Sequence, residues 1–146
     1  MNNSMSYKLR EASVEDAGHL ARLVGVLGYE MTPEQMATRM DACQSDDSKV
    51  FVALNEGAVI GFLAFHAIPL FHQPAMLGRI TAMAIDPDFQ RCGIGKLLLD
   101  AAEGLARNAG CSRMEVTSGD RREKDAHLFY LSQGYQTDCL RFLKSL

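Results

Sequence analysis

A glycine-rich segment in the middle of the chain, QRCGIG, combines residue types that suit binding of an anionic ligand. It contains Gln90, Gly93 and Gly95 and is accompanied by the cations Arg91 and Lys96. Apolar residues at helical spacing follow it, so it opens a helix whose first amides have no partner within the helix and lie at its positive end. Glycine lacks a Cβ atom and lets phosphate oxygens approach the backbone. The segment predicts a pyrophosphate site, although a glycine-rich loop with solvated cations fits the spacing as well.

Two other phosphate-binding motifs do not fit this segment. The dinucleotide fingerprint G-x-G-x-x-G needs a third glycine where this chain has Leu98. The P-loop G-x-x-x-x-G-K-[ST] needs glycine at position 90 and a hydroxyl residue after Lys96, and the chain has Gln90 and Leu97 there. A nucleotide-phosphate binding domain is therefore disfavoured.

The composition limits the partners of the chain. Its 146 residues, 47% hydrophobic, predict one domain over residues 1–146, and a net charge of -3 gives no field that would attract nucleic acid or an anionic membrane. The four cysteines are widely spaced, so we expect neither a metal site nor disulfides. No apolar run approaches the roughly 18 residues of a membrane span. We expect a cytoplasmic protein, with a homodimer as the commonest assembly on symmetry grounds.

Capping residues and hydrophobic spacing place the expected elements. Ser13 and Thr32 each precede a helix and have a polar partner three residues later. The segment after the glycine motif predicts a long helix that ends near Gly110 and buries one stripe of residues, namely Ile94, Leu98, Ala101, Leu105 and Ala109. A further helix opens at Asp120, with Glu123 as its capping partner, and stops at Gly134.

Alternating and β-branched segments predict the strands. They cover residues 7–10, 49–54, 58–68, 77–85, 113–117 and, at the end of the chain, 135 to about 143. The resulting order is β-α-α-β-β-β-α-β-α-β, which mixes hairpins with strand–helix–strand crossovers. This order predicts an α/β (α+β sandwich) fold with one mixed central sheet and helices on both faces.

The chain resembles the GNAT superfamily of N-acetyltransferases in two motifs. The segment from Gln90 to Gly95 matches the family hallmark Q/R-x-x-G-x-G/A at the start of the central helix. The later segment DAHLFYLSQGY is similar to the family pattern A-x-x-F-Y-x-x-x-G-F/Y, and the strand AMAID precedes the first motif. The resemblance extends over nearly the whole chain.

The resemblance implies acetyl-coenzyme A as co-substrate and no metal. The pyrophosphate would bind the backbone around the glycine motif, and the pantetheine arm would pair with the end of the preceding strand. One amide of that strand, from Met83 or Ala84, would polarise the thioester carbonyl in the manner of an oxyanion hole. The implied coenzyme-binding residues are Met83, Ala84, Ile85, Gln90, Arg91, Cys92, Gly93, Ile94, Gly95 and Lys96.

The resemblance also implies that Tyr130 protonates the departing thiolate. A phenol can stabilise a thiolate even by a hydrogen bond, although an aromatic residue at this helix position also suits a packing role. Two departures from the family matter. Glu123 stands where many relatives have an asparagine that contacts pantetheine, and Arg79 stands where some relatives have a glutamate base. A cation cannot accept a proton, so the base lies elsewhere.

The candidate bases are Glu30 and His66, and each has an alternative role. Glu30 also suits a solvated surface position, and His66 also suits a structural role in its strand. A water chain to solvent is a further alternative. The acceptor site is expected from two loop segments, LGYEMTP and AIPLFHQPAM, with Tyr29, Phe71 and His72 at the substrate and Arg79 either at an acidic substrate group or paired with a carboxylate.

The sequence thus predicts an N-acetyltransferase that moves acetyl directly from acetyl-coenzyme A to a primary amine of a small molecule or peptide. The alternative is a non-catalytic acyl-coenzyme A binding module in which the fold is kept without a base. Cys92 is the one residue that would favour an acyl-enzyme, because it lies beside a helix N-terminus and such a position lowers the pKa of a thiol. The resemblance, however, places Cys92 near the pyrophosphate and away from the thioester.

Overall fold

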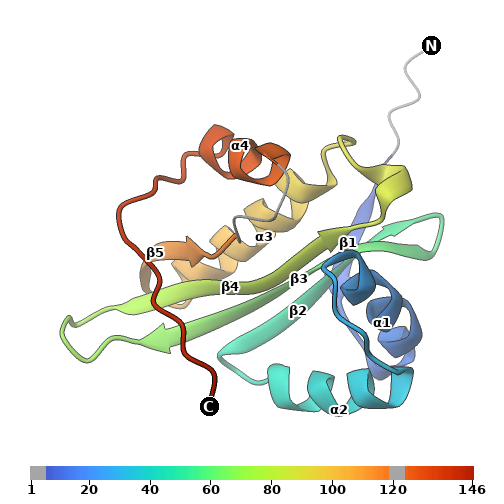
Figure 1. The fold of residues 1–146 in the computed structure, drawn as a ribbon, viewed down its shortest axis with the longest axis horizontal. Helices are drawn as coiled ribbons and strands as arrows, with labels where there is room; N and C mark the ends of the chain where they lie inside the picture. Colours follow the sequence, from blue (N-terminus) through green and yellow to red (C-terminus); the bar gives the residue numbers. More distant parts are fainter. Residues whose placement is uncertain (1–5, 119–123) are drawn as a thin grey trace. The chain divides into compact units, whose positions relative to one another are not determined.

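The computed structural model of the protein describes residues 6–118 and 124–146 (Figure 1). The chain divides into two compact units, Met1–Val116 and Thr117–Leu146. The second unit contains α4 (Lys124–Ser132). The first unit contains, in chain order, β1 (Lys8–Glu11), the 3₁₀ turn η1 (Val14–Asp16), α1 (Ala17–Val26), α2 (Pro33–Cys43), β2 (Ser48–Asn55), β3 (Ala58–Pro69), β4 (Met76–Ile85), the 3₁₀ turn η2 (Pro87–Phe89), α3 (Ile94–Asn108) and β5 (Cys111–Val116).

Five strands form one mixed sheet in the order β1-β2-β3-β4-β5. The pairs β1–β2, β2–β3 and β3–β4 are antiparallel, and the pair β4–β5 is parallel. A parallel pair needs a crossover connection, which η2 and α3 provide. The expected mixed-sheet α+β architecture is confirmed.

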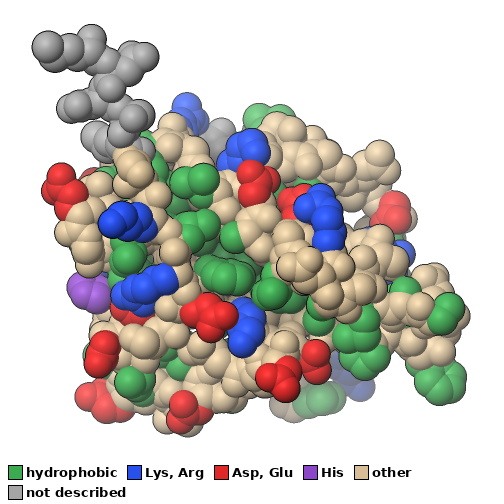
Figure 2. Space-filling model, turned by 180° about the vertical axis from the view of Figure 1, so that it is seen from behind, with side chains coloured by type: hydrophobic (Ala, Val, Ile, Leu, Met, Phe, Trp, Pro, Cys, Tyr) green, Lys and Arg blue, Asp and Glu red, His purple; other side chains and the backbone are tan. Residues whose placement is uncertain are grey.

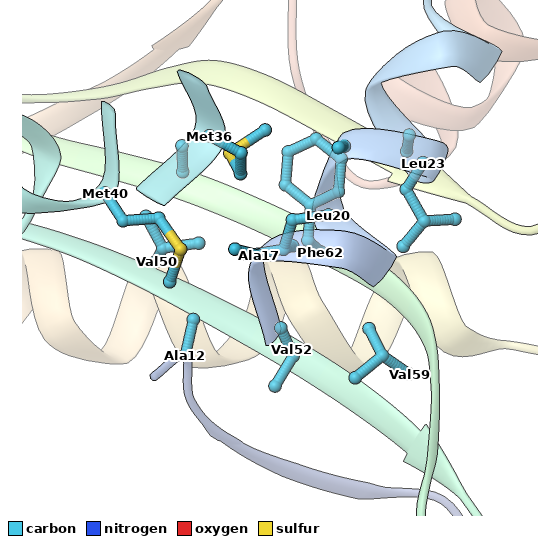
Figure 3. Packing of buried hydrophobic residues seen from close by; sticks show 13 residues of the cluster. Ala12, Ala17, Leu20, Leu23, Met36, Met40, Val50, Val52, Val59 and Phe62 are labelled. Carbon is cyan, nitrogen blue, oxygen red and sulfur yellow. The ribbon is translucent and has the colours of Figure 1, made fainter. Parts of the chain in front are cut away.

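The first helices cover one face of the sheet and form the main core with it. The start of α2 follows the predicted capping chemistry: Thr32 Oγ1 accepts from the Gln35 amide at 3.1 Å, and Gln35 Oε1 accepts from the Thr32 amide at 2.9 Å. Figure 3 shows the side chains of α1 and α2 pointing toward β2 and β3. The cluster contains Leu20, Leu23, Met36, Met40, Val50, Val52, Val59 and Phe62, together with Ala84 of β4.

The third helix covers the opposite face. Its buried residues are Ile94, Leu98, Leu99, Ala102 and Ala106. The prediction is confirmed for Ile94 and Leu98, but Ala101 and Leu105 are only half-buried and Ala109 is exposed. The i, i+4 row from Ile94 to Ala106 faces the sheet because α3 approaches β4 closely at Gly78, where an added Cβ would lie 3.2 Å from the Ala106 Cβ.

In the second unit, α4 ends in a Schellman motif. Gly134 has φ +90°, and the Tyr135 amide donates to the Tyr130 carbonyl at 3.1 Å. The rings of Tyr130 and Tyr135 meet edge to face with centroids 5.8 Å apart, which supplies the apolar contact typical of this motif. The predicted stop at Gly134 is confirmed, and the predicted helix start at Asp120 and Glu123 lies outside the described residues.

The predicted last strand is wrong. Residues 135–146 contain no strand, and Leu140, Phe142 and Leu143 are each at least 80% exposed. The apolar pattern of this segment favours a strand, but a strand is stable only when its backbone pairs and its apolar face is buried. These side chains gain no such burial here.

The surface carries charges of both signs. Figure 2 shows acidic and basic side chains interspersed over one face. No helix in the described ranges is long and apolar enough to cross a bilayer. The four cysteines carry free thiols.

One buried carboxylate joins the first strand to the first helical turn. Asp16 accepts from Arg10 through both oxygens, at 2.7 and 2.9 Å, and from the Ser13 amide at 2.8 Å, while only 4% of the residue is exposed. The hydrogen bond from Arg10 is the main cause that lowers the pKa of Asp16, and the Ser13 amide adds to it. Burial alone would raise that pKa, so the hydrogen bonds outweigh desolvation.

We predict that Asp16→Asn lowers the free energy of unfolding by about 1–3 kcal/mol at pH 7, the range for charge-assisted hydrogen bonds. Because the folded-state pKa lies below the unfolded value, the contribution of Asp16 is complete above pH ~4 and is lost as the pH falls through the folded pKa. Urea unfolding at pH 7 and at low pH measures this, with Asp41→Asn on the exposed side of α2 as control. Equal destabilisation at both pH values would contradict the assignment.

Candidate active site

A β-bulge in β4 separates two parts of this strand. Ala64 of β3 pairs with Ala82, but the next residue, Phe65, pairs with Ile80, so Thr81 is the extra residue. The pairing of β4 with β5 ends at Ile80↔Val116, whereas the pairing of β4 with β3 continues to Ile85. Residues 82–85 therefore extend beyond β5, and within the first unit one edge of their backbone has no neighbouring strand.

The turn after β4 is fixed to the sheet and to α1. The Asp86 amide donates to the Ile60 carbonyl at 2.7 Å, and its carboxylate accepts from Arg22 at 2.9 Å and from the Asp88 amide at 3.0 Å. The amide of Asp88 is the main cause that lowers the pKa of Asp86. The start of the loop that leads to α3 is thus held in place.

The predicted phosphate loop has the backbone that a nest of amides requires. Arg91 and Gly93 have φ of +62° and +83°, and the residues from Gln90 to Gly93 are exposed. The Leu97 amide donates to the Gly93 carbonyl at 3.2 Å, so the amides of residues 94–96 precede the hydrogen-bond ladder of α3. No side chain caps the helix at Gly93, and its first turn contains no acidic residue.

The charges around this helix start favour an anion. The amides lie at the positive end of a fifteen-residue helix. Lys96 stands in the first turn and pairs with Asp100 at 2.6 Å, and both side chains are more than half exposed, so this pair is worth little and Lys96 can turn toward a phosphate. Arg91 and Cys92 are exposed on the loop itself, and the Cys92 thiol donates to the Gln90 carbonyl at 3.6 Å.

The connection between α1 and α2 packs two residues of the predicted acceptor segment LGYEMTP onto the core. Leu27 and Met31 pack against the cluster that includes Ala84 of β4, as does Ala82, while Tyr29 and Glu30 are exposed. Beside the connection is an open hollow of about 350 Å³, which is lined by Glu30, Met31, Gln35, Thr38 and Arg39.

The hairpin between β3 and β4 lies at the other end of β4. Phe71 and His72 are exposed at its tip, beyond the pair Pro69↔Met76. Met76 and Met83 are seven positions apart in β4, about 23 Å at 3.3 Å per residue. The structure therefore does not bring Phe71 and His72 beside residues 82–85, and the hairpin does not form one wall with Tyr29.

Arg79 forms an ion pair that links β4 to β5. Its guanidinium lies 3.3 Å from Glu115 of β5, the residue directly opposite it, and Glu115 also meets Arg113 at 3.2 Å. Of the two roles open to Arg79 in the sequence, pairing with a neighbouring carboxylate is the one that the contacts support.

The two candidate bases have different surroundings. Glu30 is exposed in the α1–α2 connection. The ring of His66 is half-buried between two hydroxyls, with Nδ1 2.9 Å from Ser48 Oγ and Nε2 2.9 Å from Thr81 Oγ1. Burial lowers the pKa of His66 below its usual value of 6.5, so the ring is neutral at pH 7. Sequence analysis missed Ser48 and Thr81, because nothing in the local pattern reveals the bulge that brings Thr81 to His66.

In the second unit, Tyr130 lies between two aromatic rings of its own segment. Its ring centroid is 5.3 Å from that of Phe129 and 5.8 Å from that of Tyr135. The Schellman motif at Gly134 holds the Tyr135 ring there, so the orientation of the Tyr130 ring is defined within this unit.

Comparison with known proteins identifies the family of this arrangement. The model of the acetyltransferase (GNAT) family matches residues 15–135. The chain belongs to this family. The GNAT resemblance of the two sequence motifs is thereby confirmed, and the protein is an acyltransferase.

Relatives in sequence and structure agree with this membership. The aminoalkylphosphonate N-acetyltransferase of Salmonella typhimurium is 31% identical over 141 residues, which cover 95% of this chain and 91% of that protein. A GNAT family acetyltransferase of Staphylococcus aureus is 25% identical, with a TM-score of 0.81 over 97% of this chain and 100% of that one. Glucosamine-6-phosphate N-acetyltransferase of Arabidopsis thaliana shares the fold, with a TM-score of 0.83, 19% identity and coverage of 96% and 98%. GNAT enzymes generally use acetyl-coenzyme A as co-substrate, and the amides and open strand edge described above fit it.

We predict that Gly93→Ala weakens coenzyme A binding at least tenfold. The φ of +83° is costly for alanine by about 1–2 kcal/mol, so the variant relieves the strain by moving the loop amides. Gly110→Ala at the other end of α3 is the matched control, because Gly110 has φ +79° and, like Gly93, no atom within 4 Å of an added Cβ. Calorimetric titration measures the affinity. Equal affinities in the two variants would contradict a coenzyme role for the loop.

Proposed function

We propose that the protein transfers acetyl from acetyl-coenzyme A directly to a primary amine while both substrates are bound. The observation that carries this proposal is the edge of residues 82–85 that has no strand partner within the first unit. This segment leads through one short turn to the start of α3, which no side chain caps. An extended pantetheine arm can pair with such an edge as a peptide strand would, and a pyrophosphate suits the amides at the helix start.

The two anchors define where the thioester would lie. With the pyrophosphate on the amides of residues 91–96, the arm runs along Ile85, Ala84 and Met83 toward the bulge. The acyl carbon then lies where β4 and β5 part, and the amide of Met83 or Ala84 can donate to the carbonyl oxygen. An oxyanion-hole donor of this kind contributes about 10²–10³ in rate.

The acceptor is proposed to be a small primary amine that carries an anionic group. The Salmonella relative is named for aminoalkylphosphonates, molecules with an amine and a phosphonate, and it aligns with 95% of this chain. The hollow beside the α1–α2 connection holds Arg39, which suits an anionic group, and Glu30, which suits an ammonium group. Peptide amines are the alternative acceptors.

Tyr130 is proposed as the general acid that protonates the departing thiolate. The family pattern around residues 125–135 supports this role, and so does a ring held by aromatic contacts on both sides. A phenol of ordinary pKa near 10 stays protonated at neutral pH and can give its proton to a thiolate whose conjugate thiol has a pKa near 8.5.

We predict that the protein releases free thiol from acetyl-coenzyme A when a suitable amine is present. The decisive screen compares aminoalkylphosphonates and amino acids with polyamines, amino sugars and peptide N-termini, with thiol release detected by a chromogenic disulfide. Amines with an anionic group should show the highest kcat/KM. Tight binding of acetyl-coenzyme A without thiol release for any amine would instead support a non-catalytic binding module.

We further predict that Tyr130→Phe lowers kcat by about 10²–10⁴, the range of general acid catalysis, and leaves coenzyme affinity nearly unchanged. Tyr135→Phe is the matched control because it removes a hydroxyl from the neighbouring ring of the same aromatic group. Steady-state kinetics and calorimetry measure both variants. Wild-type kcat in Tyr130→Phe would remove this residue from the mechanism.

A further inference from the structure

A row of hydrogen-bonded side chains crosses three strands at the point where the sheet divides. Ser48 of β2 lies 2.9 Å from Nδ1 of His66 on β3, and Nε2 of His66 lies 2.9 Å from Oγ1 of Thr81 on β4. Each ring nitrogen is therefore within hydrogen-bonding distance of one hydroxyl group, and the two hydroxyls form the ends of the row. A histidine held in this way has a defined ring orientation, and its protonation is linked to both hydroxyls.

The accessible end of this row lies beside the unpaired strand edge. Thr81 is exposed, while His66 and Ser48 are half-buried. Thr81 is also the extra residue of the bulge, and it directly follows Ile80, the last residue of β4 that pairs with β5. Its hydroxyl is thus next in the chain to residues 82–85, where the proposed function puts the thioester arm.

We propose that Thr81 and His66 form the proton acceptor for the reacting amine, with Thr81 in contact with the amine and His66 acting through it. Ser48 positions the ring by accepting from Nδ1–H, so that Nε2 is free to accept from the Thr81 hydroxyl. This proposal rests on the proposed function and assigns the base that the position of Arg79 does not supply.

The proton transfers balance in the following way. The neutral amine attacks the thioester carbon, a C–N bond forms, and the nitrogen of the adduct becomes positively charged. That nitrogen gives one proton to Thr81 Oγ1 while the Thr81 proton passes to His66 Nε2, which leaves an imidazolium with Nδ1–H still donated to Ser48. The C–S bond then breaks, and the thiolate takes a proton from the general acid. His66 returns its proton to solvent, and solvent restores the acid.

The surroundings of His66 favour this direction of transfer. Burial lowers its pKa, so the ring is neutral and ready to accept at pH 7. Charged residues on the same face of the sheet are Arg79 on β4 and Arg113 and Glu115 on β5, and Asp47 directly precedes β2. Arg79 and Arg113 both pair with Glu115, which limits their effect on the ring. An imidazole is a much weaker base than an alkylamine, by about four pKa units, so it accepts from the acidic adduct rather than from a free ammonium ion.

The test compares a variant that keeps the row but removes its titratable group with a variant that removes the Thr81 hydroxyl. His66→Gln can still accept from Thr81, and Thr81→Val keeps the shape of the side chain without the hydroxyl. We expect kcat/KM for the amine to fall about 100-fold in both, within the range of general base catalysis, and Thr81→Ser to recover most of the rate. Coenzyme affinity and thermal midpoint should stay close to wild type. His19→Gln, on the exposed side of α1, is the control.

The pH profile separates proton transfer from a structural role. In the wild type, a plot of log kcat/KM for the amine against pH should have a slope of about two below the His66 pKa and about one above it. The reason is that both His66 and the amine must be neutral. His66→Gln should show a slope of about one throughout. The His66 pKa itself is measured by NMR titration of the ring and should change in Thr81→Val.

Two results would overturn the proposal. Wild-type rate and slope in His66→Gln would show that the ring takes no proton, and a loss of rate with the wild-type slope would show a structural role alone. Failure of the proposed function gives a different result, since the wild type would then release no thiol with any amine. The NMR titration would in that case still report whether Thr81 is hydrogen-bonded to the ring.

Discussion

The extra residue in β4 is the constraint on which the site depends. A bulge shifts the register by one residue, bends its strand and increases the local twist. Here it coincides with the end of the β4–β5 pairing, so the backbone beyond it loses a neighbour on one side. Unpaired backbone groups on a sheet edge readily accept another extended chain. The extra residue is Thr81, whose hydroxyl lies 2.9 Å from His66, so the open edge and this contact begin at the same point of β4.

The divided strand can carry a site because its far end is firmly held. Ala82 and Ala84 belong to the core under α1 and α2, and Asp86 is bonded to both β3 and α1. The loop amides then begin only a few residues later, on a helix whose apolar row is buried against the other face of the sheet. Strand edge and helix start are thus fixed relative to each other, and preorganisation of this kind limits the entropy lost on binding.

Local chemistry was predictable from the sequence, whereas features that depend on neighbouring elements were not. The Thr32 cap and the left-handed Gly110 at the end of α3 follow from residue type alone. The buried stripe of α3 was wrong in its second half, because Ile94 and Leu98 fit two rotations of the helix and only close packing at Gly78 selects one. The predicted last strand was wrong because an alternating apolar pattern does not show whether a sheet edge is present with which the segment can pair. The contact of His66 with Thr81 was not predictable, since a one-residue shift changes which side chains meet.

The ion pair between Arg79 and Glu115 gives Arg79 a structural role that differs from the role of a proton acceptor. These residues face each other one step before Ile80↔Val116, the last pair that joins β4 to β5. The pair therefore ties the two strands together up to the point where they part, and it neutralises the carboxylate nearest to that point. An arginine at this position joins the two strands but cannot take a proton, so the base proposed above is a neutral group on the same face. His66 of β3 pairs directly with Arg79 of β4, so its register position suits the proposed role of proton acceptor.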